Sequence, residues 1–235
     1  MDKRMIPTKV LPLRTVKTQD AMAVAYAAFR INEGYKKDTT RFSEDNPTQF
    51  SNKELVKYYF NTNNFVPEDF TTFKVIDEDY EQVAEAHKWL KRYVMLGLGD
   101  LDEFKKDMLS AVEHDEVAVA NLGRIAFLPE FVRRDRHESA LKKEIRVEYR
   151  DSQYLGKEKD DVEGVIKILD KFYSNRWESY NFTAVMDGNL VSFMNKYDRE
   201  VGSMVRIKAK VKSHTKNKLF QANETRLNYV KVYKV

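Results

Sequence analysis

Residues 204–212 read Met-Val-Arg-Ile-Lys-Ala-Lys-Val-Lys, an alternation of apolar and basic side chains. Successive side chains of a β-strand point to opposite faces, so this stretch predicts a strand with one apolar and one basic face. The basic face carries Arg206, Lys208, Lys210 and Lys212. Four charges of one sign suggest a polyanionic partner. A solvated outer wall that discourages aggregation is the alternative explanation of the same row.

Four more strands are expected around this one, because glycine, β-branched and aromatic residues become frequent after residue 144. The five predicted strands cover residues 162–172, 180–186, 190–195, 204–211 and 225–232. Asp187-Gly188-Asn189 is a hairpin-turn sequence between the second and third of them. Five short antiparallel strands at this spacing outline an OB-fold, a small Greek-key barrel.

The chain before the barrel is predicted to be mainly helical, which makes the fold class α+β with a helical domain at 1–148 and a barrel domain at 149–235. Residues 1–17 are expected to form an extended arm. Helices are expected at 18–32, 51–59, from 77 to a stop at Gly97 and Gly99, at 101–112, from 116 to just before Pro129, and at 133–141. Ser51 with Glu54 has capping-box spacing, and Asp102 is expected in the cap or first turn of its helix.

Composition narrows the class of protein. Hydrophobic residues make up 42% of the chain and charged residues 33%, which is typical of a globular protein. The absence of cysteine excludes disulfides, thiolate metal sites and cysteine nucleophiles, and it fits a reducing cytosol. We find no long apolar run and no signal-peptide pattern, so no membrane partner is expected. Residues 201–235 hold nine lysines and arginines against one acid, Glu224, as expected of a surface that meets phosphate.

Motifs of enzymatic chemistry are missing from the sequence. It has no GxxxxGK[ST] phosphate loop, GxGxxG, HExxH or GxSxG. His114, Asp115 and Glu116 are adjacent in sequence and are not expected to converge on a metal. We therefore expect a non-enzymatic protein with no catalytic residues, metal or cofactor. A nuclease that uses carboxylates of the helical part is the least supported alternative.

The candidate site follows from the way OB-folds hold single strands. They bind on the face of the second and third strands, between the first-to-second and fourth-to-fifth loops. Aromatic rings stack on bases and cations follow the backbone. The predicted nucleic-acid contacts are Tyr173, Arg176, Trp177, Tyr180, Lys208, Lys210, His214, Lys216, Lys218 and Phe220. Trp177, Tyr173 and Phe220 are expected to stack, whereas Phe182 and Phe193 are favoured as core fillers.

Several segments resemble a small C-terminal OB module that occurs in many bacteriophage proteins, including replication-associated ones. They are residues 188–193, 201–214 and 224–232, and Tyr154-x-Gly156-Lys157 resembles the segment that leads into the module's first strand. The match covers about residues 150–235. Residues 30–35 and 125–129 are also similar to phage proteins of this organisation, in a part to which we assign no activity.

This resemblance implies a phage protein that binds single-stranded DNA or RNA during replication or recombination. It places the protein in the cytoplasm of the infected bacterial host, with other phage or host replication proteins as further partners. The alternative is an interaction or structural module that docks onto a replication, transcription or virion component. OB-folds bind proteins and sugars as well, so the fold class alone does not decide between these functions.

Overall fold

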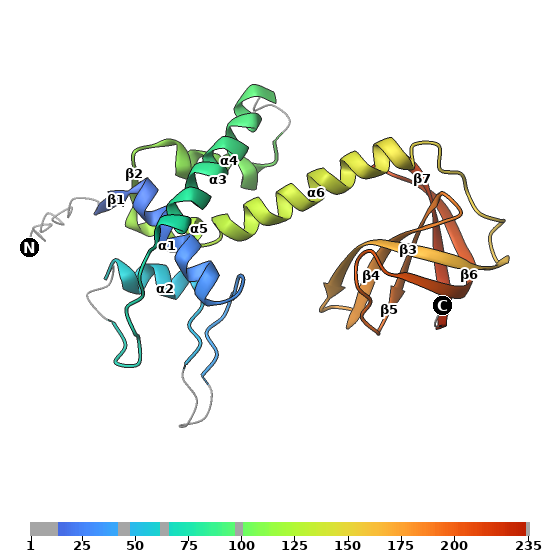
Figure 1. The fold of residues 1–235 in the computed structure, drawn as a ribbon, viewed down its shortest axis with the longest axis horizontal. Coiled ribbons are helices and arrows are strands. Elements are labelled where there is room, and N and C mark those ends of the chain that lie inside the picture. Colours follow the sequence, from blue (N-terminus) through green and yellow to red (C-terminus); the bar gives the residue numbers. More distant parts are fainter. Residues whose placement is uncertain (1–13, 42–47, 62–65, 97–100, 234–235) are drawn as a thin grey trace, which may run out of the picture. The chain divides into compact units, whose positions relative to one another are not determined.

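The computed structural model describes residues 14–41, 48–61, 66–96 and 101–233. The chain divides into two compact units, Met1–Asp135 and Arg136–Val235, the first mainly helical and the second a closed β-barrel (Figure 1). The α+β class is therefore confirmed. The division falls inside a helix, Leu128–Glu148, whereas the sequence suggests a domain boundary after residue 148.

The helical unit is built around one alanine-rich helix. Its elements are β1 (Thr15–Lys17), α1 (Thr18–Ile31), α2 (Asn52–Tyr59), α3 (Asp77–Leu96), α4 (Glu103–Glu113), β2 (Glu116–Ala118), the 3₁₀ turn η2 (Val119–Asn121), α5 (Leu122–Ile125) and the start of α6 (Leu128–Glu148). Five alanines of α1 are fully buried, and their small side chains let α2 and α3 pack closely against it. None of the helices in the described part of the chain is long and apolar enough to cross a membrane.

The helix starts read from the sequence agree with the structure at two caps. The Ser51 hydroxyl accepts a hydrogen bond from the Glu54 amide at 3.3 Å, and the Asp102 carboxylate accepts one from the Lys105 amide at 2.8 Å. The stop expected at residues 97 and 99 lies outside the described residues, as does most of the expected N-terminal arm.

The helix predicted from residue 116 is wrong at its start, and helical structure begins only with η2 and α5. Glu116–Ala118 instead pairs with Thr15–Lys17 as a two-stranded antiparallel sheet, which buries Val117. α5 ends at Ile125, before Pro129 as predicted, but Pro129 itself lies in the first turn of the next helix, α6. Proline is tolerated there, since the amides of a first turn have no intrahelical acceptor. The expected helix at 133–141 is therefore a longer one, Leu128–Glu148.

Five strands close the barrel, and their ranges match the predicted ones within a few residues. They are β3 (Asp161–Ser174), β4 (Ser179–Met186), β5 (Asn189–Asn195), β6 (Met204–Asn217) and β7 (Ala222–Tyr233), in the order β3-β4-β5-β7-β6. The prediction that all are antiparallel is wrong, because β5 and β7 run parallel. A ring of five strands cannot alternate direction at every neighbour, so one parallel pair is unavoidable.

The β4–β5 turn and the order of the strands around the barrel define its topology. Asp187 and Gly188 both have positive φ, 48° and 77°, which is the backbone of a type I′ hairpin turn and confirms the predicted turn between β4 and β5. The strands β6, β3, β4 and β5 lie side by side in the order fourth, first, second, third, which is a Greek key. β7 then fills the gap between β5 and β6.

The C-terminal half of α6 covers part of the outside of the barrel. Leu141 and Ile145 pack with Val185, Leu190 and Phe220 in a small core separate from the barrel interior. This contact covers the end of the sheet where β5 begins. The candidate site lies on the remainder of the outer face of β4, β5 and β7.

Candidate nucleic-acid interface

The outer face of β4, β5 and β7 is hollowed by a groove of about 530 Å³. β5 and β7 pair over Leu190–Ser192 and Glu224–Arg226, and the register ends there. Where the two strands separate, the floor of the groove reaches the stacked rings of Phe182 and Phe193, whose centroids are 5.1 Å apart. The residues that line the groove are Phe172, Asn181, Phe182, Thr183, Ser192, Phe193, Met194, Lys212, Asn217, Glu224, Arg226, Leu227, Asn228 and Tyr229.

Large apolar side chains stand exposed among the groove-lining residues. Tyr229 is 78% exposed, Phe172 62% and Met194 44%. Each comes from a different strand, β7, β3 and β5 respectively. Exposed apolar side chains that gather on one concave surface mark a binding site more often than scattered ones do. Large apolar side chains such as Tyr197 and Met204 are exposed elsewhere on the barrel too, so the hollow that groups these three makes the groove the candidate site.

Tyr229 is held there by a break in the β6–β7 ladder. The register shifts between Lys208 and Lys210, so that β7 carries an extra residue opposite β6. Tyr229 has φ 53°, a conformation that bulky side chains rarely adopt. Such a backbone costs on the order of 1–3 kcal/mol and tends to persist at functional sites.

The other groove residues supply hydrogen bonds and positive charge. Asn181, Thr183 and Ser192 lie half-buried on β4 and β5 and offer neutral polar groups. Lys212 and Arg226 are exposed cations that also line the groove. Lys212 has no acidic partner in the described part of the chain. Flat rings, neutral polar groups and cations are the set that a single strand of nucleic acid needs.

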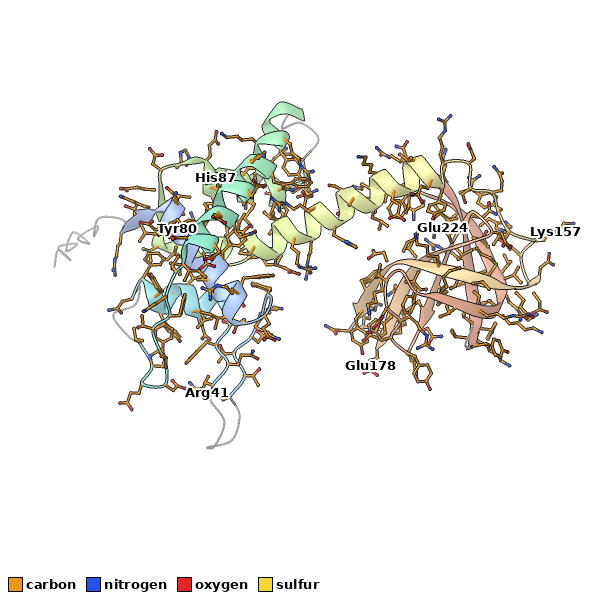
Figure 2. All side chains as sticks on the ribbon, viewed as in Figure 1. Arg41, Tyr80, His87, Lys157, Glu178 and Glu224 are labelled. Atoms are coloured by element: carbon orange, nitrogen blue, oxygen red, sulfur yellow. The ribbon has the colours of Figure 1, made fainter. Side chains whose placement is uncertain are left out.

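Glu224 is the one acid of the groove, and it is only 4% exposed. It accepts hydrogen bonds from the Ser192 hydroxyl at 2.6 Å and from the Asn217 side-chain amide. The Arg226 guanidinium lies 3.8 Å away. Figure 2 shows Glu224 on the barrel, away from the end marked by Glu178. These contacts compensate the cost of burying the carboxylate.

Four predicted contacts form two pairs where β3 leads into β4. Trp177 is 62% exposed, and the Arg176 guanidinium lies 5.1 Å from its ring centroid. Tyr173 pairs with Tyr180 across the hairpin, with ring centroids 4.9 Å apart. The next pair along the ladder is Phe172 with Asn181, which lines the groove. Successive strand side chains point to opposite faces, so Tyr173 and Tyr180 face away from the groove, and Tyr180 packs against the barrel interior.

The basic row of β6 is not brought to the same place. Its alternation is confirmed, because Ile207 is buried whereas Lys208 and Lys210 are exposed. However, the row faces β3, where Arg206 bonds Glu163 at 2.8 Å and Lys210 lies 3.3 Å from Asp161. Of this row, Lys212 alone lines the groove. Lys208 and Lys210 stand on a neighbouring wall that is partly neutralised.

The remaining predicted contacts are partly buried in one case and exposed in two others. His214 is half-buried, stacks on Tyr154 with centroids 4.6 Å apart and places Nε2 3.2 Å from the Leu155 carbonyl oxygen. It therefore fastens the segment before β3 to the barrel. Lys216 and Lys218 are exposed near the turn between β6 and β7.

Phe220 requires a correction, because it is 5% exposed and packs in the core formed with Leu141 and Ile145. A ring covered by α6 cannot stack on a base. The sequence alone gives no sign that α6 reaches this turn, so it favours a surface position for the Phe220 ring. Phe182 and Phe193 are core residues, as favoured.

The two loops expected to flank the binding face lie at opposite ends of it. Tyr180 pairs with Asn195, so the β3–β4 turn lies where β5 ends. Leu190 pairs with Glu224, so the β6–β7 turn lies where β5 begins. Seven residues of β5 span about 20 Å. The groove lies between the loops, so that a strand of nucleic acid would run from one to the other.

None of the ten predicted contacts lines the groove, and the residues that sequence reasoning missed include Phe172, Met194, Arg226 and Tyr229. A signal for Tyr229 exists in the sequence. Leu227 is inward, and the next inward positions are Val230 and Val232, so the two-residue alternation changes phase between them. A change of phase of this kind indicates a bulge. The other three carry no signal that separates them from ordinary strand residues.

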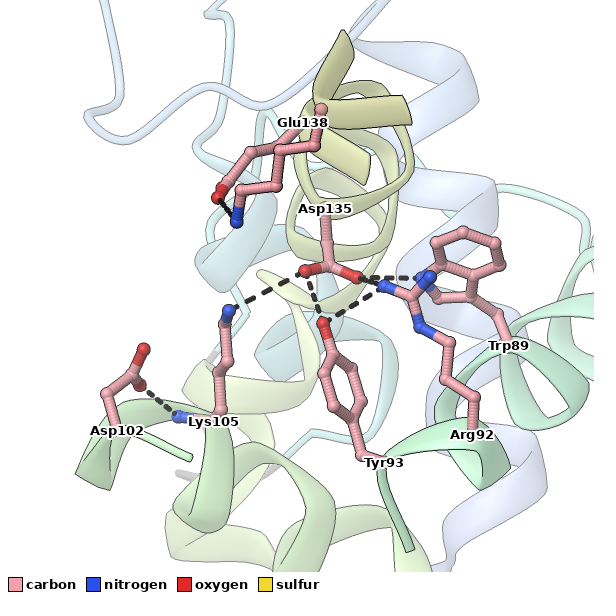
Figure 3. A network of polar contacts seen from close by, with 8 residues as sticks. Trp89, Arg92, Tyr93, Asp102, Lys105, Asp135 and Glu138 are labelled. Atoms are coloured by element: carbon pink, nitrogen blue, oxygen red, sulfur yellow. Dashed lines mark hydrogen bonds and ion pairs between the residues drawn. The ribbon is translucent and has the colours of Figure 1, made fainter. Parts of the chain in front are cut away.

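A second polar cluster lies in the helical unit and has a structural role (Figure 3). Asp135 of α6 is 6% exposed and accepts hydrogen bonds from the Trp89 indole at 2.8 Å, from Tyr93 and from Arg92. Lys105 of α4 approaches it at 3.7 Å. Burial, and then the hydrogen bond to Asp135, raise the pKa of Tyr93 to about 12. The cluster joins α3, α4 and α6.

The helical unit also has a hollow of about 610 Å³ beside the start of α1. His87 lines it, and burial together with Lys91 lowers the pKa of its imidazole. His114, Asp115 and Glu116 lie on the same rim. Within residues 14–41, 48–61, 66–96 and 101–233, no three histidine or acidic side chains are grouped as a metal site would require.

Comparison of the chain with protein-family models, with curated proteins and with solved structures gives no match.

Proposed function

We propose that the barrel binds single-stranded nucleic acid, with DNA as the first candidate, in the groove on the outer face of β4, β5 and β7. The observation that carries the proposal is the grouping of exposed Phe172 and Tyr229 with the cations Lys212 and Arg226 around one hollow. Rings and cations on a concave surface match the requirements for stacking bases and neutralising a backbone.

The topology supports describing the barrel as an OB-fold. A five-stranded Greek-key barrel that binds ligands on its second and third strands is the description of that fold. Here the second and third strands of the barrel are β4 and β5, and the groove lies on them. The same fold binds sugars and proteins, so the composition of the groove carries the functional part of the proposal.

In the proposed mode of binding, bases stack on Tyr229 and Phe172 in the groove, and on exposed Trp177 at the β3–β4 turn beyond it. Neutral side chains such as Asn181 then meet base edges, and Lys212 with Arg226 contacts phosphates. Each stacked base contributes on the order of 1–3 kcal/mol. Release of counterions from the phosphates makes the affinity fall with added salt. No step in this mode is catalytic.

The biological setting is proposed from the sequence resemblance. The likeness of residues 150–235 to a phage OB module favours a role in phage replication or recombination, in an infected bacterial cell. Other replication proteins are the proposed partners of the helical unit. The alternative, a module that docks a protein, predicts that oligonucleotides do not bind the groove.

A fluorescence-anisotropy titration tests the proposal. A labelled single strand of mixed sequence, about 16 nucleotides long, and the corresponding duplex would be titrated with the full chain at two salt concentrations. We expect the single strand to bind more tightly than the duplex, and its affinity to fall as salt rises. Absence of single-strand binding at low salt would overturn the proposal and favour the docking alternative.

A further inference from the structure

The groove contains an acid in a surface of basic and neutral side chains. Glu224 is the single acid among residues 201–235, yet it lies buried on β7 rather than exposed beside the cations. A buried carboxylate costs free energy unless hydrogen bonds compensate it. Ser192 and Asn217 supply such bonds, and Arg226 stays exposed at 3.8 Å. Its position at the floor of a proposed phosphate-binding groove therefore needs a reason.

The groups around Glu224 offer more hydrogen-bond acceptors than donors. A carboxylate has about four acceptor positions, and Ser192 and Asn217 occupy two of them. The Ser192 hydroxyl proton is used by Glu224, so that side chain offers a ligand only its lone pairs. The acceptor positions of Glu224 that these two donors leave unused give this part of the groove more acceptors than donors.

From this arrangement we propose that Glu224 makes the groove selective for nucleobases that carry an exocyclic amino group, over uracil and thymine. The inference rests on the proposed function, because it names which bases the same groove accepts. An amino group donates to a carboxylate, as cytosine does to glutamate in DNA recognition. Uracil has a carbonyl oxygen in place of that amino group, and this oxygen would face the Glu224 acceptors.

Oligodeoxycytidylate and oligodeoxyuridylate of equal length test the selectivity. The two probes have the same backbone and differ at the 4-position of the base and its adjacent ring nitrogen. At slightly alkaline pH, where cytosine is unprotonated, we expect the cytidine strand to bind about tenfold more tightly, the size of one good base contact. Equal affinities would overturn the selectivity and leave the proposed function intact. Failure of both strands to bind would overturn the proposed function itself.

Substitution of Glu224 tests whether this residue, and not some other part of the groove, causes the preference for cytidine over uridine. Glu224→Gln can turn its amide NH₂ toward a carbonyl, so the preference should fall to less than about twofold. Lys208→Gln, on the neighbouring wall, is the matched control and should leave the ratio unchanged. A Glu224→Gln protein that keeps the full preference would overturn the inference. If this variant does not fold, wild-type protein with N4,N4-dimethylcytidine strands decides, because that base has no amino proton and should bind as weakly as uridine.

Discussion

Removing the two groove cations should reduce the salt dependence of binding by an amount that can be calculated. Lys212 and Arg226 are exposed, line the groove and are the proposed phosphate contacts. Each phosphate contact on a single strand contributes about 0.7 to the slope of log affinity against log salt. The variant Lys212→Gln with Arg226→Gln should therefore have a slope smaller in magnitude by about 1.4.

This difference is large enough to measure by anisotropy. Between about 50 and 200 mM salt, the affinity of the wild type should fall about sevenfold more than that of the double variant. The control is Arg206→Gln with Lys210→Gln, which removes the same charge from the wall where Glu163 and Asp161 already pair with these residues. Equal slopes for the two double variants would refute the assignment of the groove, because net charge alone would then explain the binding.

Three further perturbations test particular residues. Tyr229→Ala should weaken single-strand binding by about 1–3 kcal/mol in the same titration, because a stacking ring is lost, and an unchanged affinity would remove Tyr229 from the site. Asp135→Ala should lower the free energy of unfolding in urea by about 3–5 kcal/mol, since it removes the buried carboxylate to which Trp89, Tyr93 and Arg92 donate hydrogen bonds. A loss below about 1 kcal/mol would mean that the network does not hold α3, α4 and α6 together. The pKa of Tyr93 is raised from 10.0 to about 12, so its contribution to stability is complete below pH 10 and is lost as pH rises through 12. Tyr93→Phe should therefore lose less stability across that alkaline range than the wild type, and parallel losses would contradict the assignment.

The strands of the barrel could be predicted from the sequence because their signals are local. Alternation at 204–211 and the Asp187-Gly188 turn fix strand direction and register without reference to distant residues. The direction of β5 relative to β7 is a property of ring closure, which no local pattern encodes. The pairing of Val16 with Val117, 101 positions apart, is equally non-local, and it replaced the start of the predicted helix.

The candidate site was predicted less well, for physical reasons that differ between residues. Trp177 and Tyr173 are exposed because a hairpin turn leaves its side chains in solvent, which the sequence indicates. Phe220 looks similar in sequence but is covered by α6, a contact between elements far apart in the chain. The alternation of β6 correctly predicts that Lys210 is exposed. Its ion pair with Asp161 depends on the neighbouring strand β3, which the local pattern does not encode.

An NMR titration of the ¹⁵N-labelled chain with a short single strand tests the central claim most directly. Our account predicts that amide shifts concentrate on the outer face of β4, β5 and β7, at Thr183, Ser192 and Asn228, and spare Arg206 and Lys210. Shifts confined to the wall of Arg206 and Lys210, or the absence of shifts at low salt, would contradict the binding of nucleic acid in the groove.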